Sequence, residues 1–402
     1  IQIILNIMSY FPITFINNNK CDEEMFRLCC SNDDNIKAKP FLSKTTFKYI
    51  KQMKQEIDKY QTEWDNLKKY VNPYEYIHTQ IPDCKSSVSK IKPISRSYYK
   101  LIEICDHLNI LNDSYYPIST FHLAEGPGGF IEAMISLRKN PKDTYHGMTL
   151  IGDDTNIPGW NKNNQLKKQS NVSLIKGVTN DGDLLKKENL QYCFDLYKSS
   201  MNIITGDGGF DFSMDFNKQE LVSVKLILAQ IFYAIILQKS GGTFIIKFFD
   251  IFYKSTCDMI FLLSCFYDKL YIIKPNTSRF ANSEKYIVCK FFKSNINKDE
   301  LLPVFKKIID GIQHTNYVTN ILNFKLPSIF TSKIEEINAV LGQQQIECII
   351  NTLQLIENQN NSEKLEQLKQ NNIQKCINWC IKYRIPHHKI IQQTNIFLEQ
   401  EN

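Results

Sequence analysis

Four ionisable residues that are far apart in the sequence could perform chemistry together: Lys100, Asp207, Lys247 and Glu284. Lys247 is the most informative because it interrupts the apolar run 244–249. Burying a lysine is costly unless its ammonium reaches a partner or a cleft. Two amines and two carboxylates that share one cleft perturb one another's protonation, as acid–base sites require. We therefore expect the two acids to position the lysines, and Lys247 to act on a hydroxyl proton.

A glycine-rich segment, residues 124–130, is the second feature with chemical potential; its sequence is Ala-Glu-Gly-Pro-Gly-Gly-Phe. A short apolar run precedes this segment and a helical pattern follows it, which predicts a strand, a tight turn and a helix. Glycines in such a turn let the backbone approach a nucleoside at the carboxyl end of the strand. An ordinary α/β connection has the same pattern, so the interpretation depends on the acids that follow later strands.

Three aspartates follow later predicted strands. Asp181 and Asp183 come after the strand 172–175, and Asp207 comes after the strand 201–206 among three glycines. A carboxylate in such a position can accept a hydrogen bond from the amine of an adenine, but it can equally cap the next helix. Asp207 is the stronger candidate, because open α/β sheets bind ligands at the carboxyl ends of their strands.

The elements that would position these residues alternate between strand and helix. Strand patterns occur at 121–124, 145–151, 172–175, 201–206, 244–249, 269–274 and 285–292. Between them lie helical patterns, including the long apolar segment 219–239, which Gly241 and Gly242 should end. This alternation predicts an α/β fold with a mostly parallel sheet covered by helices on both faces. The last strand returns from its predecessor through a short polar loop, so we expect it to be antiparallel.

Helical patterns flank this region on both sides. They occupy residues 43–71 before it and residues 301–313, 332–356 and 362–384 after it. We therefore divide the chain into an N-terminal helical extension (1–90), a central domain (91–295) and a C-terminal helical region (296–402). Within the central domain, Ser95 can cap a helix that carries Arg96 and Lys100 on one face.

Composition restricts the class of protein only broadly. The 402 residues carry a net charge of +6 and are 43% hydrophobic, which suits a large globular domain and permits a polyanionic partner. No apolar run approaches the length of a membrane span, so we expect no membrane partner. The chain starts with Ile1, and Met8 is a candidate for the natural start.

The 12 cysteines contain no CxxC pair, which favours a reducing intracellular compartment. Cys376 and Cys380 would share a helix face near His387 and His388, and a zinc site is conceivable there. Buried free thiols on an apolar helix face are the favoured interpretation, so we expect no metal.

Six segments, in a fixed order, resemble the FtsJ-like (RrmJ-like) family of S-adenosylmethionine-dependent RNA ribose 2′-O-methyltransferases. The segments are 124–130, 147–150, 181–183, 207–210, 241–250 and 278–290. They are most similar to the cap-specific mRNA 2′-O-methyltransferases, which convert cap 0 to cap 1. The resemblance covers about residues 90–293 and implies a Rossmann-like methyltransferase sheet, with S-adenosyl-L-methionine as cofactor.

The resemblance also implies roles for individual residues. Lys100, Asp207, Lys247 and Glu284 match the Lys-Asp-Lys-Glu catalytic tetrad of the family, in which Lys247 would be the base or orienting cation for the 2′-hydroxyl. The cofactor would contact Glu125, Gly126, Pro127, Gly128, Gly129, Phe130, Asp183 and Asp207, with Asp183 at the adenine. The segments near the RNA path contain Arg96, Asn217, Lys218, Gln219, Arg279 and Asn282, for which a solvated surface role is equally open.

The predicted reaction is methyl transfer to the ribose 2′-hydroxyl of the first transcribed nucleotide of capped mRNA. The capped mRNA 5′ end is the expected partner, and other capping or transcription components are open as partners. Thr149-Leu150 stands where the smaller rRNA enzymes carry an acid, which argues against an rRNA target. Two alternatives stay open: a 2′-O-methyltransferase that acts on rRNA or tRNA, and an inactive RNA-binding subunit that keeps the fold.

The expected location is intracellular, in the nucleus or cytoplasm. The abundance of Asn, Ile and Lys suggests an AT-rich genome, and the helical C-terminal addition is similar to that of methyltransferases from large DNA viruses. For a viral protein, the viral factory would be the location.

Overall fold

The structure is a computed structural model that describes residues 9–13, 23–33, 38–111, 116–152, 159–160, 164–209, 218–359 and 361–388. The candidate start Met8 and the candidate RNA contact Asn217 lie outside this described part.

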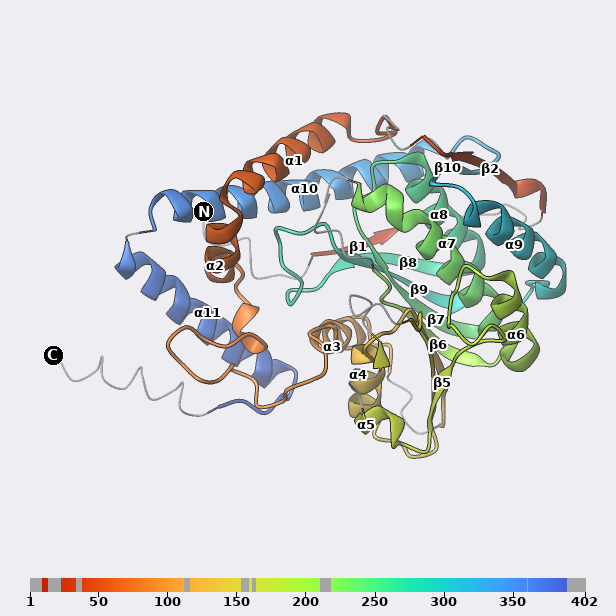
Figure 1. Cartoon of the computed structure of the whole chain (residues 1–402), viewed down its shortest axis with the longest axis horizontal. Helices are drawn as coiled ribbons and strands as arrows, with labels where there is room; N and C mark the ends of the chain where they lie inside the picture. The colour runs from red at the N-terminus through yellow and green to blue at the C-terminus, as the bar shows by residue number, and fades with distance from the viewer. Residues whose placement is uncertain are drawn as a thin grey trace.

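An eight-stranded sheet forms the centre of the molecule, with the strand order β1-β8-β9-β7-β6-β3-β4-β5 (Figure 1). The strands from β5 to β7 pair in parallel, and β9 runs antiparallel between β7 and β8. The predicted α/β fold, with a mostly parallel sheet and an antiparallel return strand, is confirmed. The strand bounds are β1 (Ser9–Ile13), β3 (Ser119–Leu123), β4 (Thr144–Met148), β5 (Val172–Ile175), β6 (Met201–Gly206), β7 (Gln238–Phe248), β8 (Tyr267–Lys274) and β9 (Lys285–Phe292).

Both faces of the sheet are buried, because alternate residues of each central strand enter different apolar clusters. In β7, Phe244 and Ile246 pack in one cluster and Ile245 packs in the other. The first cluster includes residues of α6, α7, α8 and α9, and the second includes residues of α3, α4 and α11. The helix bounds are α3 (Ser97–His107), α4 (Gly129–Arg138), α5 (Asn164–Lys167), α6 (Lys187–Tyr197), α7 (Gln219–Leu237), α8 (Lys254–Phe266) and α9 (Lys298–Gln313).

Helix α7 corrects the expectation that no apolar run approaches membrane-spanning length. Its 19 residues are long and apolar enough to cross a membrane by length and composition, but 83% of its most apolar 18-residue window lies inside the fold. The apolar character of α7 is therefore accounted for by its position against the sheet, in the core of the protein.

The predicted helix stop at Gly241 and Gly242 is wrong. Helix α7 ends at Leu237, β7 begins at the next residue, and Gly241 has a φ of 75° within the strand. The chain changes direction without a loop, because the buried Gln238 amide donates to the carbonyl oxygens of Met201 (2.9 Å) and Asn202 (3.1 Å) on β6.

The flanking regions contain strands that their helical patterns did not predict. Strand β1 pairs antiparallel with β8 and extends the main sheet, and β2 (Phe26–Ser31) pairs with β10 (Tyr317–Leu322) in a second sheet. Each of these strands has five or six residues.

The flanking helices lie close to their expected positions. Helix α1 (Lys44–Ile57) packs along α10 (Ser328–Glu357), and α2 (Gln61–Val71) packs against both α10 and α11 (Ser362–Lys382) (Figure 1). The N-terminal and C-terminal flanks therefore form one joint layer. Short 3-10 helices complete the N-terminal flank: η2 (Glu23–Met25), η3 (Asp58–Tyr60) and η4 (Glu75–Ile77).

Candidate active site

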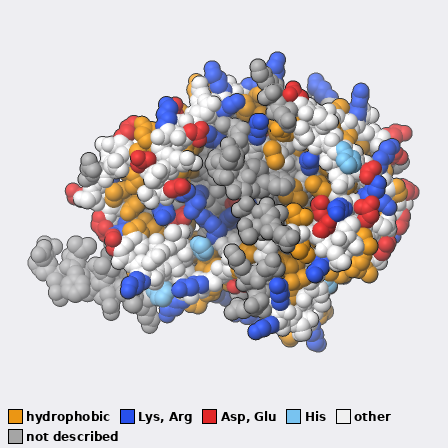
Figure 2. All heavy atoms as spheres, in the orientation of Figure 1, with side chains coloured by type: hydrophobic (Ala, Val, Ile, Leu, Met, Phe, Trp, Pro, Cys, Tyr) orange, Lys and Arg blue, Asp and Glu red, His pale blue; other side chains and the backbone are white. Residues whose placement is uncertain are grey.

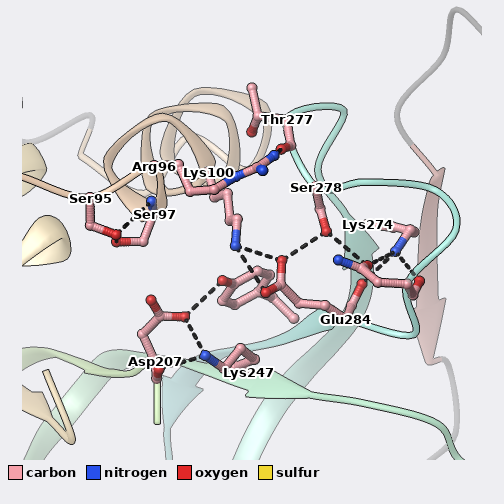
Figure 3. A network of polar contacts seen from close by, with 12 residues as sticks. Ser95, Arg96, Ser97, Lys100, Asp207, Lys247, Lys274, Thr277, Ser278 and Glu284 are labelled. Atoms are coloured by element: carbon pink, nitrogen blue, oxygen red, sulfur yellow. Dashed lines mark hydrogen bonds and ion pairs between the residues drawn. The ribbon is translucent and has the colours of Figure 1, made fainter. Parts of the chain in front are cut away.

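The fold brings four residues together at one edge of the sheet (Figure 3), and we call Lys100, Asp207, Lys247 and Glu284 the ionisable cluster. Asp207 directly follows β6, and Lys247 is near the carboxyl end of the neighbouring strand β7. Glu284 directly precedes β9, whose beginning lies at the same edge because β9 is antiparallel. Lys100 reaches this edge from the first turn of α3.

Two ion pairs organise the ionisable cluster. The Nζ atom of Lys100 lies 2.7 Å from Oε1 and 2.9 Å from Oε2 of Glu284. The Nζ atom of Lys247 lies 3.3 Å from Oδ1 of Asp207 and donates to the Asp207 carbonyl oxygen at 2.6 Å. A lysine ammonium has three N–H donors, so Lys247 can offer one more to an oxygen of a bound substrate.

The charges of the Lys100–Glu284 pair depend on each other. Burial would raise the pKa of the Glu284 carboxyl, but the ammonium groups of Lys100 and Lys247 and hydrogen bonds from Lys100 and Ser278 hold it well below its usual range. Burial lowers the pKa of Lys100, and the negative charges of Glu284 and Asp207 oppose this change. Glu284 is therefore a fixed negative charge at neutral pH, and it holds Lys100 in place.

Two further residues of the site did not attract attention in the sequence. Tyr286 is fully buried on β9, and its hydroxyl donates to Oδ1 of Asp207 at 2.8 Å. Lys274, at the end of β8, donates to the carbonyl oxygens of Asn282 (2.8 Å) and Glu284 (2.7 Å). Burial lowers the pKa of Lys274 to about 7. Lys247 was singled out because it interrupts an apolar run, and the related signal of a lysine directly after the apolar run 270–273 could have identified Lys274.

The predicted glycine turn follows β3 and leads into α4, next to the ionisable cluster. Gly128 has a φ of 110°, a conformation that side chains strongly disfavour. A Cβ atom at Gly129 would lie 2.2 Å from Oγ of Ser97, so the glycine lets α4 pack closely against α3, which carries Lys100. The turn therefore helps to place a cluster residue through the close packing of α4 against α3.

Glu125 has an unsatisfied oxygen in the same turn. Its buried Oε1 accepts from the backbone N–H groups of Phe130 (2.6 Å) and Ile131 (3.3 Å), whereas Oε2 has no hydrogen-bond partner among the described residues. Burial, and then the charge of Asp207, raise the pKa of Glu125 well above its usual range. Since buried polar atoms are normally satisfied, Oε2 is suited to meet a polar group of a ligand.

The predicted adenine contact, Asp183, also caps a turn. Its Oδ1 accepts from the backbone N–H of Leu185 at 2.8 Å, so the capping alternative accounts for this oxygen. The side chains of Leu150 and Ile151, which follow β4, are 40% and 39% exposed, and the Ile151 N–H donates to the carbonyl oxygen of Asp181 at 2.7 Å. Exposed apolar side chains near carboxylates suit a flat ring with polar edges.

The described candidates for RNA contacts lie in different environments. Arg96 and Arg279 form ion pairs with the buried Glu75, so they are not simply solvated. Oδ1 of Asn282 accepts from Lys274 at 3.0 Å, Oε1 of Gln219 accepts from Ser283 at 2.8 Å, and Lys218 is exposed before α7. On the face shown in Figure 2, Lys and Arg side chains gather in a hollow near the middle.

The proposed zinc alternative has no support in the described part of the chain. No group of three or more His, Cys, Asp or Glu residues there could hold a metal ion. Cys376 and Cys380 are fully buried on α11, and Sγ of Cys376 donates to the carbonyl oxygen of Pro73 at 3.4 Å. The two thiols are part of the apolar packing between α11 and the N-terminal flank.

Comparison with known proteins gives one family match. Residues 93–292 match the model of the FtsJ-like methyltransferase family. Among solved structures, a putative ribosomal RNA methyltransferase from Plasmodium falciparum aligns with a TM-score of 0.36 and 22% identity, over 49% of this chain and 97% of that chain.

Similar curated proteins have names that share one activity. "Cap-specific mRNA (nucleoside-2'-O-)-methyltransferase 1" is 29% identical in Trypanosoma brucei brucei, over 55% of this chain and 60% of that protein. The human protein of that name is 32% identical, over 49% of this chain and 24% of that protein. "Cap-specific mRNA (nucleoside-2'-O-)-methyltransferase 2" of Danio rerio is 27% identical, over 71% of this chain and 40% of that protein. The chain covers less than two thirds of the length of each of these relatives.

Proposed function

Because the chain carries an FtsJ-like methyltransferase domain over residues 93–292, we propose that it methylates the ribose 2′-hydroxyl of the first transcribed nucleotide of capped mRNA. The observation that carries this proposal is the ionisable cluster at the carboxyl edge of the sheet, where two lysines and two acids form ion pairs. The names of similar proteins support a capped mRNA substrate. The choice of the first nucleotide is the finer part of the proposal.

The residues at the carboxyl edge fit S-adenosylmethionine, the cofactor that this domain implies. The unsatisfied Oε2 of Glu125 offers a partner for a polar group, and Gly128, which has no side chain, belongs to the same turn. Leu150 and Ile151 offer apolar surface for an adenine. The carboxylate of Asp183 would accept a hydrogen bond from the amine of this adenine. When bound, S-adenosylmethionine supplies a methyl group activated by the positive charge of its sulfonium.

In this proposal, Lys247 acts directly on the sugar hydroxyl. Two roles are open to Lys247: a base for the hydroxyl proton, or a cation that neutralises the charge left when the proton leaves. In both roles the amine must be fixed, and the carbonyl and carboxylate of Asp207 fix it at 2.6 and 3.3 Å. Tyr286 holds the same carboxylate, and the Lys100–Glu284 pair adds a second, fixed lysine to the cleft. Positioning then supplies much of the rate enhancement.

The proposed function is tested with capped and uncapped versions of one short RNA. We expect methyl transfer from S-adenosylmethionine to the capped RNA only, and nuclease digestion followed by mass spectrometry should place the methyl group on the first nucleotide. Equal transfer to uncapped RNA, or preferred transfer to rRNA or tRNA, would support the alternative enzyme. If calorimetry detects no binding of S-adenosylmethionine, the inactive RNA-binding subunit becomes the better interpretation.

Replacement of Gly128 by alanine should weaken cofactor binding. The added Cβ would strain a backbone with a φ of 110° and shift the turn that faces the ligand. We expect the free energy of unfolding to fall by roughly 1 kcal/mol or more, and the affinity for S-adenosylmethionine to fall roughly tenfold. Calorimetry and urea unfolding measure the two effects.

The matched control for Gly128→Ala is Gly241→Ala. Gly241 also has a positive φ, of 75°, and a Cβ atom there would meet no other atom within 4 Å. This variant should lose some stability but keep its affinity for S-adenosylmethionine. Equal losses of affinity in the two variants would show that general destabilisation, not the turn, controls cofactor binding.

The proposed substrate also defines the expected setting of the protein. Its partner is the capped 5′ end of mRNA, and other capping or transcription components would act on the same RNA end. We therefore propose an intracellular location, in the nucleus or cytoplasm, which imaging of the labelled protein would test.

A further inference from the structure

A buried acid in the N-terminal flank binds two arginines beside the ionisable cluster. Glu75 belongs to η4, and its side chain is fully buried. Its two carboxylate oxygens accept from Nη2 (2.6 Å) and Nε (3.0 Å) of Arg279, and Nη1 of Arg96 lies 3.7 Å from Oε1. The two hydrogen bonds between Arg279 and Glu75 form a bidentate pair, the strongest geometry for a guanidinium and a carboxylate.

Glu75 remains charged in this environment. Burial would raise the pKa of its carboxyl, but the hydrogen bonds from Arg279, the charges of both arginines and the hydrogen bond from Thr79 lower the pKa to about 2. One negative charge therefore faces two guanidinium groups. Glu75, Arg96 and Arg279 together carry a net charge of +1, and the more distant carboxylates of Asp65 and Glu284 also act on Arg279.

The side chains of the two arginines remain partly exposed to solvent, and some of their N–H donors are not used by Glu75. Their side chains are 29% and 31% exposed, although the carboxylate between them is fully buried. Nη2 of Arg96 donates to the carbonyl oxygen of Thr277 at 2.9 Å, which ties it to the loop 275–284. Each guanidinium has five N–H donors in a rigid plane, so both can still donate to a ligand.

Arg96 and Arg279 belong to the same two segments as Lys100 and Glu284 of the ionisable cluster. Arg96 directly precedes α3, four residues before Lys100, and Arg279 lies in the loop that ends at Glu284. Figure 3 shows Arg96 above Lys100, on the side of the cluster away from β7. The N-terminal flank also holds the backbone of this loop, because the Phe280 N–H donates to Oδ1 of Asn72 at 3.2 Å.

We propose that Glu75 is a positioning residue that holds Arg96 and Arg279 as a preformed site for an RNA phosphate next to the target ribose. This inference rests on the proposed function. Without the carboxylate, two neighbouring guanidinium groups repel each other and separate. Glu75 lies outside the family match at 93–292. In this proposal, the N-terminal flank therefore contributes to substrate recognition.

The inference is tested with Glu75→Gln, which keeps the size of the side chain but removes its charge. For a short capped RNA, we expect KM to rise roughly tenfold or more, and kcat to change less than about threefold, because one charge-assisted contact is disturbed outside the reacting atoms. The affinity for S-adenosylmethionine should not change. Glu63→Gln, at an exposed site on α2, is the matched control and should behave as the wild type.

A double-mutant cycle separates positioning from general stability. Arg279→Ala alone should raise KM, and adding Glu75→Gln to Arg279→Ala should raise it further by much less than Glu75→Gln does in the wild type. Additive effects, or an unchanged KM in Glu75→Gln, would overturn the inference. If Glu75→Gln does not fold, Arg279→Lys decides instead, since it keeps the charge, loses the bidentate geometry and should raise KM.

Failure of the inference can be distinguished from failure of the proposed function. If the wild-type protein does not methylate capped RNA, the proposed function fails before any variant is compared. If the wild type is active and the Glu75 and Arg279 variants keep its KM, only the positioning role of Glu75 fails.

Discussion

Replacement of Lys247 by alanine is expected to lower kcat for methylation of capped RNA by roughly 10²- to 10⁴-fold. The reason is geometric: Asp207 fixes the ammonium at 2.6 and 3.3 Å, and one N–H donor remains for the sugar oxygen. Alanine offers no group that could orient this oxygen or receive its proton. The measurement is single-turnover transfer of a labelled methyl group, with cofactor affinity determined separately by calorimetry.

Lys290→Ala is the matched control for Lys247→Ala. Lys290 lies on β9, at the opposite end of the pairing with β7, where its Nζ atom donates to the carbonyl oxygen of Leu108 at 2.8 Å. This variant loses a partly buried lysine of the same sheet and should keep its kcat. A Lys247→Ala protein that retains more than about a tenth of wild-type kcat would contradict the proposed role.

The second large effect concerns the Lys100–Glu284 pair, whose side chains are only 9% and 13% exposed. Lys100→Met removes one partner and leaves a buried carboxylate, so we expect the free energy of unfolding to fall by roughly 3 kcal/mol or more. Methyl transfer should fall as well, because Lys100 belongs to the ionisable cluster. Urea unfolding and the transfer assay measure the two losses.

The double variant Lys100→Met with Glu284→Gln distinguishes stability from activity. Since it leaves no lone charge, it should recover most of the lost stability and remain inactive. The folded-state pKa of Glu284 is lowered, so its stabilising contribution is fully present above the ordinary Glu pKa of about 4.3 and is lost progressively as the pH falls from there through the lower folded-state pKa. Strictly additive losses of stability would show that the two residues are not coupled.

The sequence predicted the part of the molecule in which local pattern and topology agree. Strand and helix patterns alternate between residues 119 and 292, so a parallel sheet followed from them, and parallel strands carry the residues after them to one edge. Lys247 stood out because burying an unpaired ammonium in an apolar strand costs free energy. These two arguments located Asp207 and Lys247 without any knowledge of distances.

The parts of the fold and the site that the sequence did not predict depend on contacts between distant segments. Glu75 and Arg279 are 204 residues apart, and no local pattern links a short turn in the N-terminal flank to a loop after β8. Tyr286 resembles an ordinary core residue of a strand, and only the neighbouring carboxylate of Asp207 reveals its polar function. The change from α7 to β7 was missed because Gln238, not a glycine, makes the turn by bonding to the adjacent strand.

Strand β1 has a practical consequence for work with this protein. It occupies the outer side of β8 along the register from Ser9 to Ile13, where it satisfies backbone groups that would otherwise face solvent. An uncovered edge of this kind invites pairing between separate molecules. Recombinant versions trimmed to the family match alone would uncover it, so preparations intended for concentration or crystallisation should retain these five residues and place purification tags elsewhere.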